Sequence, residues 1–190
     1  MPFRLPALLL ALLAACATTA GPPEPASAPA TRWDHRPEAA AWTAATMQAL
    51  AAAPGLLAHV PADVGEYCPA YPGAAPAQRA AFWTGYLSAL AKYESRWNPA
   101  ASGAGGRYRG LMQIAPATAH AFGCDAGALY EGAENLACAV RILAVEVPAR
   151  GAIVAGPTDM GGVTSHWPPA RKPDNRAEIA TFTAAQDYCR

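Results

Sequence analysis

A glutamate on the apolar side of a predicted helix constrains this chain more than any other feature. The glutamate is Glu94, and large apolar side chains lie at spacings of three and four residues before and after it, which places them on the same side of a helix. They are Trp83, Leu87, Leu90 and Trp97. A carboxyl among such neighbours is poorly hydrated, and desolvation disfavours its ionised form and raises its pKa. We therefore expect Glu94 to stay protonated near neutral pH and to be able to act as a general acid. Glycoside cleavage uses such an acid to protonate the leaving oxygen.

The ordinary alternative is a helix-terminal glutamate that pairs with Lys92 or Arg96. The residues that follow argue against it: Glu94-Ser95, Asn98-Pro99, Ser102 in a glycine-rich loop, and Gly110-Leu111-Met112-Gln113. Together they resemble the catalytic core of the soluble-lytic-transglycosylase-like family, which shares its fold with goose-type lysozyme. The resemblance covers residues 77–143 and implies an all-α, lysozyme-like domain.

The resemblance also implies roles for individual residues. Glu94 is the catalytic acid, with Gln113 beside it and Met112 against the sugar, while Gly110 and Ser102 belong to the substrate groove. No metal ligand set and no cofactor are implied.

One segment departs from the family pattern, because the family's Ala-Tyr-Asn-Ala-Gly segment, which places a tyrosine in the active site, is missing. Gly161-Gly162 followed by His166-Trp167 is the nearest substitute. We predict Trp167 as a sugar platform and His166 as a helper to Glu94. A packed tryptophan and an exposed histidine are the simpler alternatives.

The implied function is a peptidoglycan lytic transglycosylase that cleaves the β-1,4 bond between N-acetylmuramic acid (MurNAc) and N-acetylglucosamine (GlcNAc) without water, leaving 1,6-anhydro ends. Two alternative functions remain: a hydrolytic muramidase, and a lipoprotein that binds peptidoglycan without cleaving it. Hydrolysis by two carboxylates needs a partner for Glu94, and Glu131 and Glu134 are the candidates. Arg107 and Arg109 are either solvated loop charges or contacts for the carboxylates of peptidoglycan's peptides.

The start of the chain predicts export and a lipid anchor. A short basic region and an apolar run too short to span a bilayer form a signal peptide over residues 1–15. It ends in Leu13-Ala14-Ala15-Cys16, which looks like a bacterial lipobox in which Cys16 is lipidated; an ordinary signal peptide is the alternative. Residues 16–32 read as a proline-rich tether and 33–190 as the folded domain. With alanine after the cysteine, the resemblance favours the periplasmic face of the outer membrane.

Composition narrows the partners and the covalent chemistry. Lys plus Arg and Asp plus Glu are 14 each, a balance that disfavours nucleic acid as a partner. Of the 5 cysteines, assigning Cys16 to lipid leaves four, which allow three disulfide pairings in an oxidising compartment. We favour Cys124 with Cys138 and Cys68 with Cys189. A zinc site is the rival, although no typical zinc-ligand spacing occurs.

Periodicity and breaker residues predict five helices, over residues 37–53, 77–92, 116–122, 134–147 and 175–188. Residues 56–76 read as loop, and residues 148–175 have no predicted element. No alternating pattern long enough for a sheet occurs.

Overall fold

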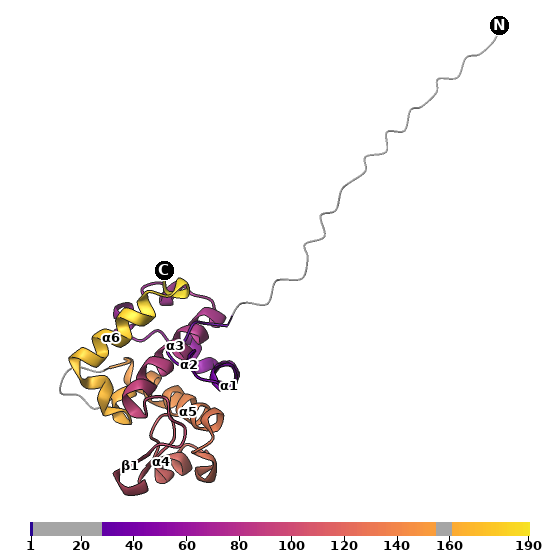
Figure 1. Cartoon of the computed structure of the whole chain (residues 1–190). Helices are drawn as coiled ribbons and strands as arrows, with labels where there is room; N and C mark the ends of the chain where they lie inside the picture. Colours follow the sequence, from indigo (N-terminus) through magenta and orange to yellow (C-terminus); the bar gives the residue numbers. More distant parts are fainter. Residues whose placement is uncertain (2–27, 155–160) are drawn as a thin grey trace.

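The computed structural model describes residues 1, 28–154 and 161–190, so the predicted signal peptide, Cys16 and most of the tether lie outside the described residues. The described part is helical (Figure 1). Its α-helices are α1 (Ala39–Ala51), α2 (Pro54–Ala58), α3 (Pro76–Glu94), α4 (Pro116–Ala121), α5 (Gly132–Arg150) and α6 (Pro173–Ala184). The all-α prediction is confirmed. Within these residues no helix is both long enough and apolar enough to cross a membrane.

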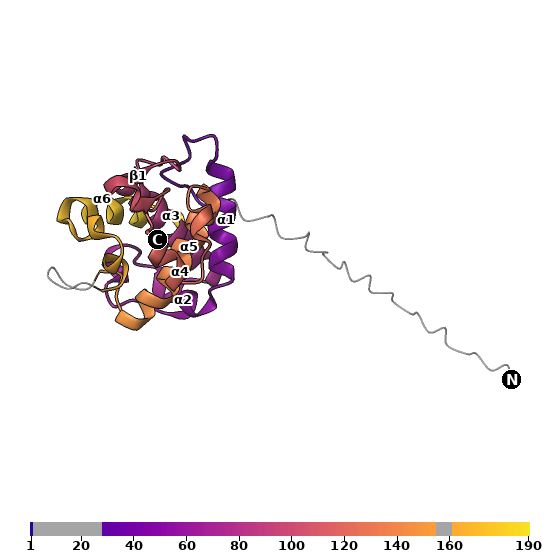
Figure 2. The same cartoon turned by 90° about the horizontal axis from the view of Figure 1, so that it is seen from below.

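Helix α3 runs through the middle of the domain, with α1 and α6 packed on different sides of it (Figures 1 and 2). Every residue from Ala80 to Ala91 is buried, so the buried surface extends round the whole helix rather than along one stripe. Small side chains make this close packing possible. A Cβ atom on Gly85 would lie 2.4 Å from the Tyr188 hydroxyl, which explains a glycine in the middle of a helix.

The segment before α1 is fixed onto α3. Trp33 is fully buried, and its indole N–H donates a hydrogen bond to Thr43 Oγ1 at 2.9 Å. The Arg32 backbone N–H donates to Ser88 Oγ at 3.0 Å, and its guanidinium contacts the Glu178 carboxylate on α6. The segment therefore passes over the C-terminal half of α3.

The helix boundaries differ modestly from the predicted ones. α5 is longer at both ends than expected and includes Pro148 in its last turn, before Gly151 ends the helix with a φ of 74°. The predicted loop at 56–76 overlaps the short helix α2. In the described part of residues 148–175 lie two 3₁₀ turns, Val163–Ser165 and Pro168–Arg171.

A small hairpin follows α3, made of the antiparallel strands β1 (Ser102–Gly103) and β2 (Tyr108–Arg109). Each strand has only 2 residues, which is too short to leave an alternating pattern in the sequence. The glycine-rich residues predicted as a loop form this hairpin and its turn.

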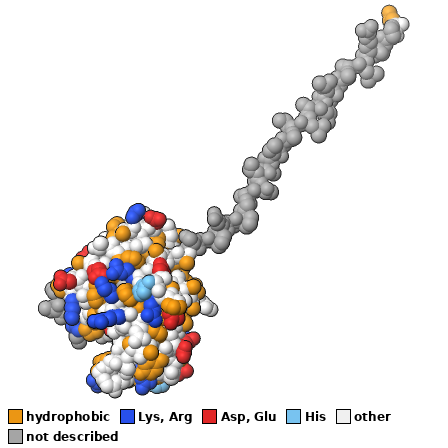
Figure 3. Space-filling view, in the orientation of Figure 1, with side chains coloured by type: hydrophobic (Ala, Val, Ile, Leu, Met, Phe, Trp, Pro, Cys, Tyr) orange, Lys and Arg blue, Asp and Glu red, His pale blue; other side chains and the backbone are white. Residues whose placement is uncertain are grey.

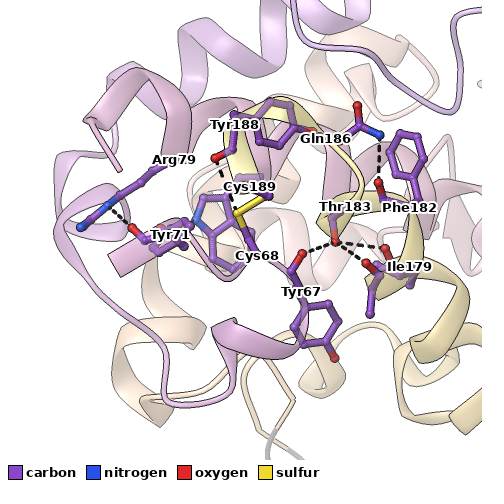
Figure 4. The surroundings of a disulfide bond; sticks show 12 residues. Tyr67, Cys68, Tyr71, Arg79, Ile179, Phe182, Thr183, Gln186, Tyr188 and Cys189 are labelled. Carbon is purple, nitrogen blue, oxygen red and sulfur yellow. Dashed lines mark hydrogen bonds between the residues drawn. A yellow bond between two sulfur atoms is a disulfide. The ribbon is translucent and has the colours of Figure 1, made fainter. Parts of the chain in front are cut away.

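Two disulfides join the four cysteines of the described part, Cys68 to Cys189 and Cys124 to Cys138. The favoured pairing is confirmed, and these cysteines are not available as zinc ligands. Figure 4 shows the first bond beside Tyr67 and Thr183, whose hydroxyl donates to the Tyr67 carbonyl at 2.8 Å. This bond ties the segment before α3 to the end of the chain.

We predict that removing Cys68–Cys189 destabilises the domain more than removing Cys124–Cys138. The sequence separations are 121 and 14 residues, and the longer loop loses more entropy when it is closed in the unfolded chain. Replacing both cysteines of a pair by alanine should lower the free energy of unfolding by about 5 kcal/mol for the first pair and about 3 kcal/mol for the second. Urea denaturation of the two double variants beside the wild type measures both values. Equal losses would contradict the loop-length argument.

Candidate active site

Glu94 is the last residue of α3 and borders two hollows of the surface. Its Oε1 atom is buried and has no hydrogen-bond partner among the described residues. Desolvation by burial raises the pKa of the Glu94 carboxyl to about 8. The protonated carboxyl is therefore the main form at neutral pH, which is the state required of a general acid.

The first hollow, which we call the His166 cavity, has a volume of about 400 Å³ and lies between the hairpin, α4, α5 and the turns after residue 160. The second, which we call the Trp97 groove, has a volume of about 880 Å³ and is more open. Glu94 and Gln113 line both hollows, so the carboxyl lies where they meet. A chain-like ligand that filled both hollows would pass Glu94.

The chain after Glu94 takes an unusual path. Arg96 and Trp97 have φ angles of 54° and 57°, in the left-handed region that costs a residue with a side chain about 1–2 kcal/mol. These two residues end the helix before Asn98-Pro99, which was the predicted stop. The Trp97 indole N–H donates to the Ser88 carbonyl at 2.8 Å, and this bond holds the ring beside the groove.

Gln113 fastens the hairpin beside Glu94. Its side-chain amide donates to the Ala101 carbonyl at 3.2 Å and to the Gly110 carbonyl at 2.9 Å, and its backbone φ is 47°. A Cβ atom on Gly103 would lie 2.4 Å from Gln113 Oε1, so the hairpin approaches this side chain closely. Strained backbone on both sides of a buried carboxyl is typical of a functional site.

Asn135, at the start of α5, holds the loop from Arg109 to Met112. Its fully buried side chain accepts a hydrogen bond from the Met112 N–H at 2.8 Å. It donates to the carbonyls of Arg109 at 3.0 Å and Leu129 at 2.8 Å. Gly110 is packed against the Leu129 carbonyl, because a Cβ atom on Gly110 would lie 2.0 Å from the Leu129 carbonyl oxygen.

Charged groups gather at the rim of the Trp97 groove. The Glu178 carboxylate accepts hydrogen bonds from Lys92 and Tyr93, which lower the pKa of Glu178. Burial, and next the hydrogen bond to Glu178, raise the pKa of Tyr93 to about 12. His35 packs edge-to-face on Trp97, with 4.8 Å between the ring centroids. Figure 3 shows several Lys and Arg side chains together on one face of the domain.

Three of the residues predicted to bind substrate, Ser102, Gln113 and Trp167, line the hollows. Ser102 is exposed and lines the Trp97 groove, and Gln113 lies beside Glu94. Gly110 is close by but buried, where it permits tight backbone packing instead of lining a hollow.

Met112 and Trp167 are both buried. Met112 is 0% exposed, so its side chain packs in the core and offers no surface to a sugar. Trp167 is 1% exposed and its indole N–H donates to the Met112 carbonyl at 2.8 Å. Trp167 lines the His166 cavity with little of its surface exposed, and its role as a sugar platform stays a prediction. His166 lies in the same cavity as Glu94.

The candidate second carboxylates are not part of the site. Glu131 and Glu134 are exposed residues at the start of α5, and neither lines the His166 cavity or the Trp97 groove. Arg107 is exposed in the hairpin turn. The Arg109 guanidinium lies over the Tyr130 ring, 5.8 Å from its centroid.

Sequence reasoning missed Asn135, His35 and Glu178. Asn135 follows Glu134 at the polar start of a core helix, a place where asparagine gives no particular signal. His35 and Glu178 come from the two ends of the domain, and only the folded chain brings them to the end of α3.

Part of the chain is similar to a known family, and its fold is similar to solved structures. Residues 73–147 match the family model described as the transglycosylase SLT domain. Three solved structures of a protein named Bd0314 DslA are similar, one of a wild-type form and two of glutamate-to-glutamine mutants. They share 27–29% sequence identity and TM-scores of 0.75–0.76, and cover 85–86% of this chain and 98–99% of their own. No curated protein sequence matches the chain.

We predict that Glu94→Gln stabilises the protein at high pH and has little effect on stability at low pH. The carboxyl's pKa is about 8 in the folded protein and 4.5 for a glutamate exposed to water. Between pH 4.5 and about pH 8 the folded protein therefore binds one proton at this carboxyl that the unfolded chain has released. The wild type therefore loses stability as pH rises from about 4.5 through about 8, whereas glutamine does not titrate. At pH 9 the variant should be more stable by at least about 1 kcal/mol. Urea denaturation at pH 5 and pH 9 measures the difference, and a pH-independent difference would refute the raised pKa.

We predict that Asn135→Asp loosens the loop beside Glu94. The aspartate cannot donate to the Arg109 and Leu129 carbonyls, and it places a carboxylate against them in the core. The free energy of unfolding should fall by about 2 kcal/mol or more. Asn98→Asp is the matched control, because Asn98 is exposed and its side-chain oxygen, which accepts from the Ala100 N–H, is kept. Equal effects of the two variants on denaturation would show that Asn135 does not fasten the loop.

Proposed function

We propose that this chain is a lytic-transglycosylase-like enzyme that binds peptidoglycan glycan strands and cleaves them without water. The support is the match of residues 73–147 to the transglycosylase SLT domain, together with the similar solved structures. The proposed products are GlcNAc ends and 1,6-anhydro-MurNAc ends. One observation carries the proposal: a buried, unpartnered carboxyl at Glu94, with a pKa of about 8, lies where two hollows meet.

In the first step Glu94 acts as general acid. A glycan strand that occupies the His166 cavity and the Trp97 groove brings one glycosidic bond to the carboxyl. The protonated carboxyl gives its proton to the glycosidic oxygen, which leaves as the 4-hydroxyl of GlcNAc. The substrate's own N-acetyl group, held by loop residues near Ser102, stabilises the positive charge at C1 of MurNAc.

In the second step the same residue acts as base. The Glu94 carboxylate takes the proton of the MurNAc C6 hydroxyl while that oxygen bonds to C1. The bond to GlcNAc is replaced by an internal bond, no water is consumed, and Glu94 ends protonated for the next cycle. A pKa near the working pH suits a group that must give and then take a proton.

The preference for this reaction over hydrolysis rests on the number of carboxylates. Enzymes that hydrolyse glycosides with two carboxylates keep both within about 10 Å of each other across the bond. Among the described residues that line either hollow, Glu94 is the one carboxylate. A single acid that becomes the base fits this arrangement.

We also propose that the mature protein is anchored by lipid on Cys16 and works in the periplasm, held at the outer membrane. The support is the lipobox-like Leu13-Ala14-Ala15-Cys16 and the proline-rich residues that follow it. A peptidoglycan substrate is found in the same compartment. Metabolic labelling with a fatty acid, comparing the wild type with Cys16→Ala, tests the anchor.

We predict that the mature domain releases muropeptides from purified sacculi that are lighter by one water than hydrolytic products, and that Glu94→Gln releases none. Glutamine keeps the shape of the side chain and removes its proton chemistry. Mass spectrometry of the released material measures both points. Glu131→Gln is the matched control and should keep wild-type activity, because Glu131 lies outside both hollows.

Other outcomes would replace the proposal. Hydrolysed MurNAc ends would indicate a muramidase. Its catalytic base would then be a group other than a carboxylate that lines one of the two hollows. Sacculus binding without any release, in the wild type, would indicate a binding protein.

A further inference from the structure

His166 lines the cavity next to Glu94 and forms a polar pair with Glu146, and the proposed chemistry gives neither residue a role. His166 Nε2 lies 3.3 Å from Glu146 Oε1, and both side chains are about three-quarters buried, with exposures of 23% and 27%. Glu146 belongs to α5, whereas His166 follows the 3₁₀ turn Val163–Ser165. The pair therefore links two elements that are far apart along the chain, at a wall of the His166 cavity.

The imidazole ring is held in one orientation from several sides. It packs edge-to-face on Phe122, with centroids 5.4 Å apart and an interplanar angle of 87°, and on Trp167 at 6.0 Å. Trp167 is itself fixed by its hydrogen bond to the Met112 carbonyl. With Glu146 on Nε2, the ring has little freedom to turn, so its second nitrogen points in a defined direction.

The second nitrogen, Nδ1, is available to a ligand. It forms no hydrogen bond with any described residue. It is also absent from the set of fully buried polar atoms without partners, a set that includes His59 Nε2 and Glu94 Oε1. Within the part of the chain that the structure describes, Nδ1 is therefore unpaired and not fully buried.

The tautomer follows from the Glu146 contact. A carboxylate oxygen accepts hydrogen bonds, so the Nε2–H donates to Glu146 and, in the neutral ring, Nδ1 is left as an acceptor. This is how a carboxylate orients a histidine at many active sites. A ligand group that meets Nδ1 must then be a donor, such as a sugar hydroxyl or an amide N–H.

The rest of the cavity suits a saccharide. Ile114, Ile142 and Pro168 provide apolar walls, while Thr118 and Ser165 add hydroxyl groups. Gln113 is less available, because its amide nitrogen already bonds to two loop carbonyls. A hollow that combines apolar walls with a few placed polar groups is typical of a small-ligand site.

We propose that His166, positioned by Glu146, accepts a hydrogen bond from a hydroxyl or acetamido N–H of the saccharide unit in the His166 cavity, and so helps select and place that unit beside Glu94. The inference rests on the proposed function in one respect, since it takes the occupant of the cavity to be a peptidoglycan saccharide. His166 is a binding residue in this scheme and Glu146 is a positioning residue.

Two substitutions of His166 separate this role from a structural one. In His166→Gln the amide can reach the Nε2 position and keep the contact with Glu146, but nothing replaces Nδ1. In His166→Asn the shorter side chain places an acceptor near the Nδ1 position but no longer reaches the Glu146 carboxylate. If His166 binds sugar, glutamine is the more damaging change for binding; if it only links α5 to the turn, asparagine is the more damaging change for stability and glutamine is tolerated.

The measurement is the binding of a GlcNAc-MurNAc tetrasaccharide to the Glu94→Gln protein by isothermal titration calorimetry, with each His166 variant added to that background. We expect His166→Gln to raise Kd about 3- to 10-fold, the worth of one hydrogen bond of about 0.5–1.5 kcal/mol. His166→Asn should raise it about 2-fold or less. Glu146→Leu, which leaves the ring unoriented, should resemble His166→Gln. His120→Gln, at an exposed position on α4, is the control and should leave Kd unchanged.

A second readout reports on the nitrogen itself. In ¹⁵N spectra of the histidine rings, the His166 Nδ1 signal should shift when the tetrasaccharide is added, and the His120 signals should not. An unmoved His166 signal, equal Kd values for all variants, or no binding of the tetrasaccharide to the Glu94→Gln protein would each overturn the inference. If binding depends on His166 but the wild type releases no anhydro product, the inference stands and the proposed function fails. If the wild type releases anhydro products but the His166 variants have unchanged Kd values, the proposed function stands and the inference about His166 fails.

Discussion

The burial of the Glu94 carboxyl is the constraint on which the rest of the structure depends. An uncharged carboxyl can be buried at modest cost, but an ionised one without a partner is costly, so the pKa rises to about 8. The fold encloses α3 on all sides from Ala80 to Ala91, and Glu94 follows three residues after this stretch. The carboxyl at the end of the helix is thus held by the most enclosed element of the domain. Its position is set by the core and not by a hydrogen bond of its own, because its Oε1 has no partner among the described residues.

The loop that faces Glu94 depends on a different kind of interaction. Its backbone passes through left-handed conformations, including Gln113 with a φ of 47°, which are unfavourable unless neighbouring groups enforce them. Asn135 supplies three hydrogen bonds from one fully buried side chain, and Gln113 supplies two more. Since buried polar groups are costly when unpaired, the loop has few alternative conformations. Polar contacts therefore fix the loop, as apolar packing fixes the acid.

The sequence allowed the acid to be predicted because its signal is local. Glu94 lies on a helix whose spacing is visible in consecutive residues, and the even number of remaining cysteines limited the disulfide pairings to three. Met112 was misassigned for a physical reason: residue type says that a side chain is large and apolar, but not whether a loop turns it towards a groove or into the core. His35 was invisible because its place beside Trp97 depends on how the N-terminal segment crosses α3, a contact between distant parts of the chain.

The charges around the site explain how Glu94 keeps a raised pKa among basic residues. Lys92 and Arg96 lie two positions before and after it, and a salt bridge with either would stabilise the carboxylate and lower its pKa. On a helix, residues two apart face different directions, and Lys92 is instead bonded to Glu178 on α6. Burial is the one cause that acts on the Glu94 pKa, without a contribution from either cation. The Glu178 carboxylate thus holds the Lys92 ammonium group and keeps it from pairing with Glu94.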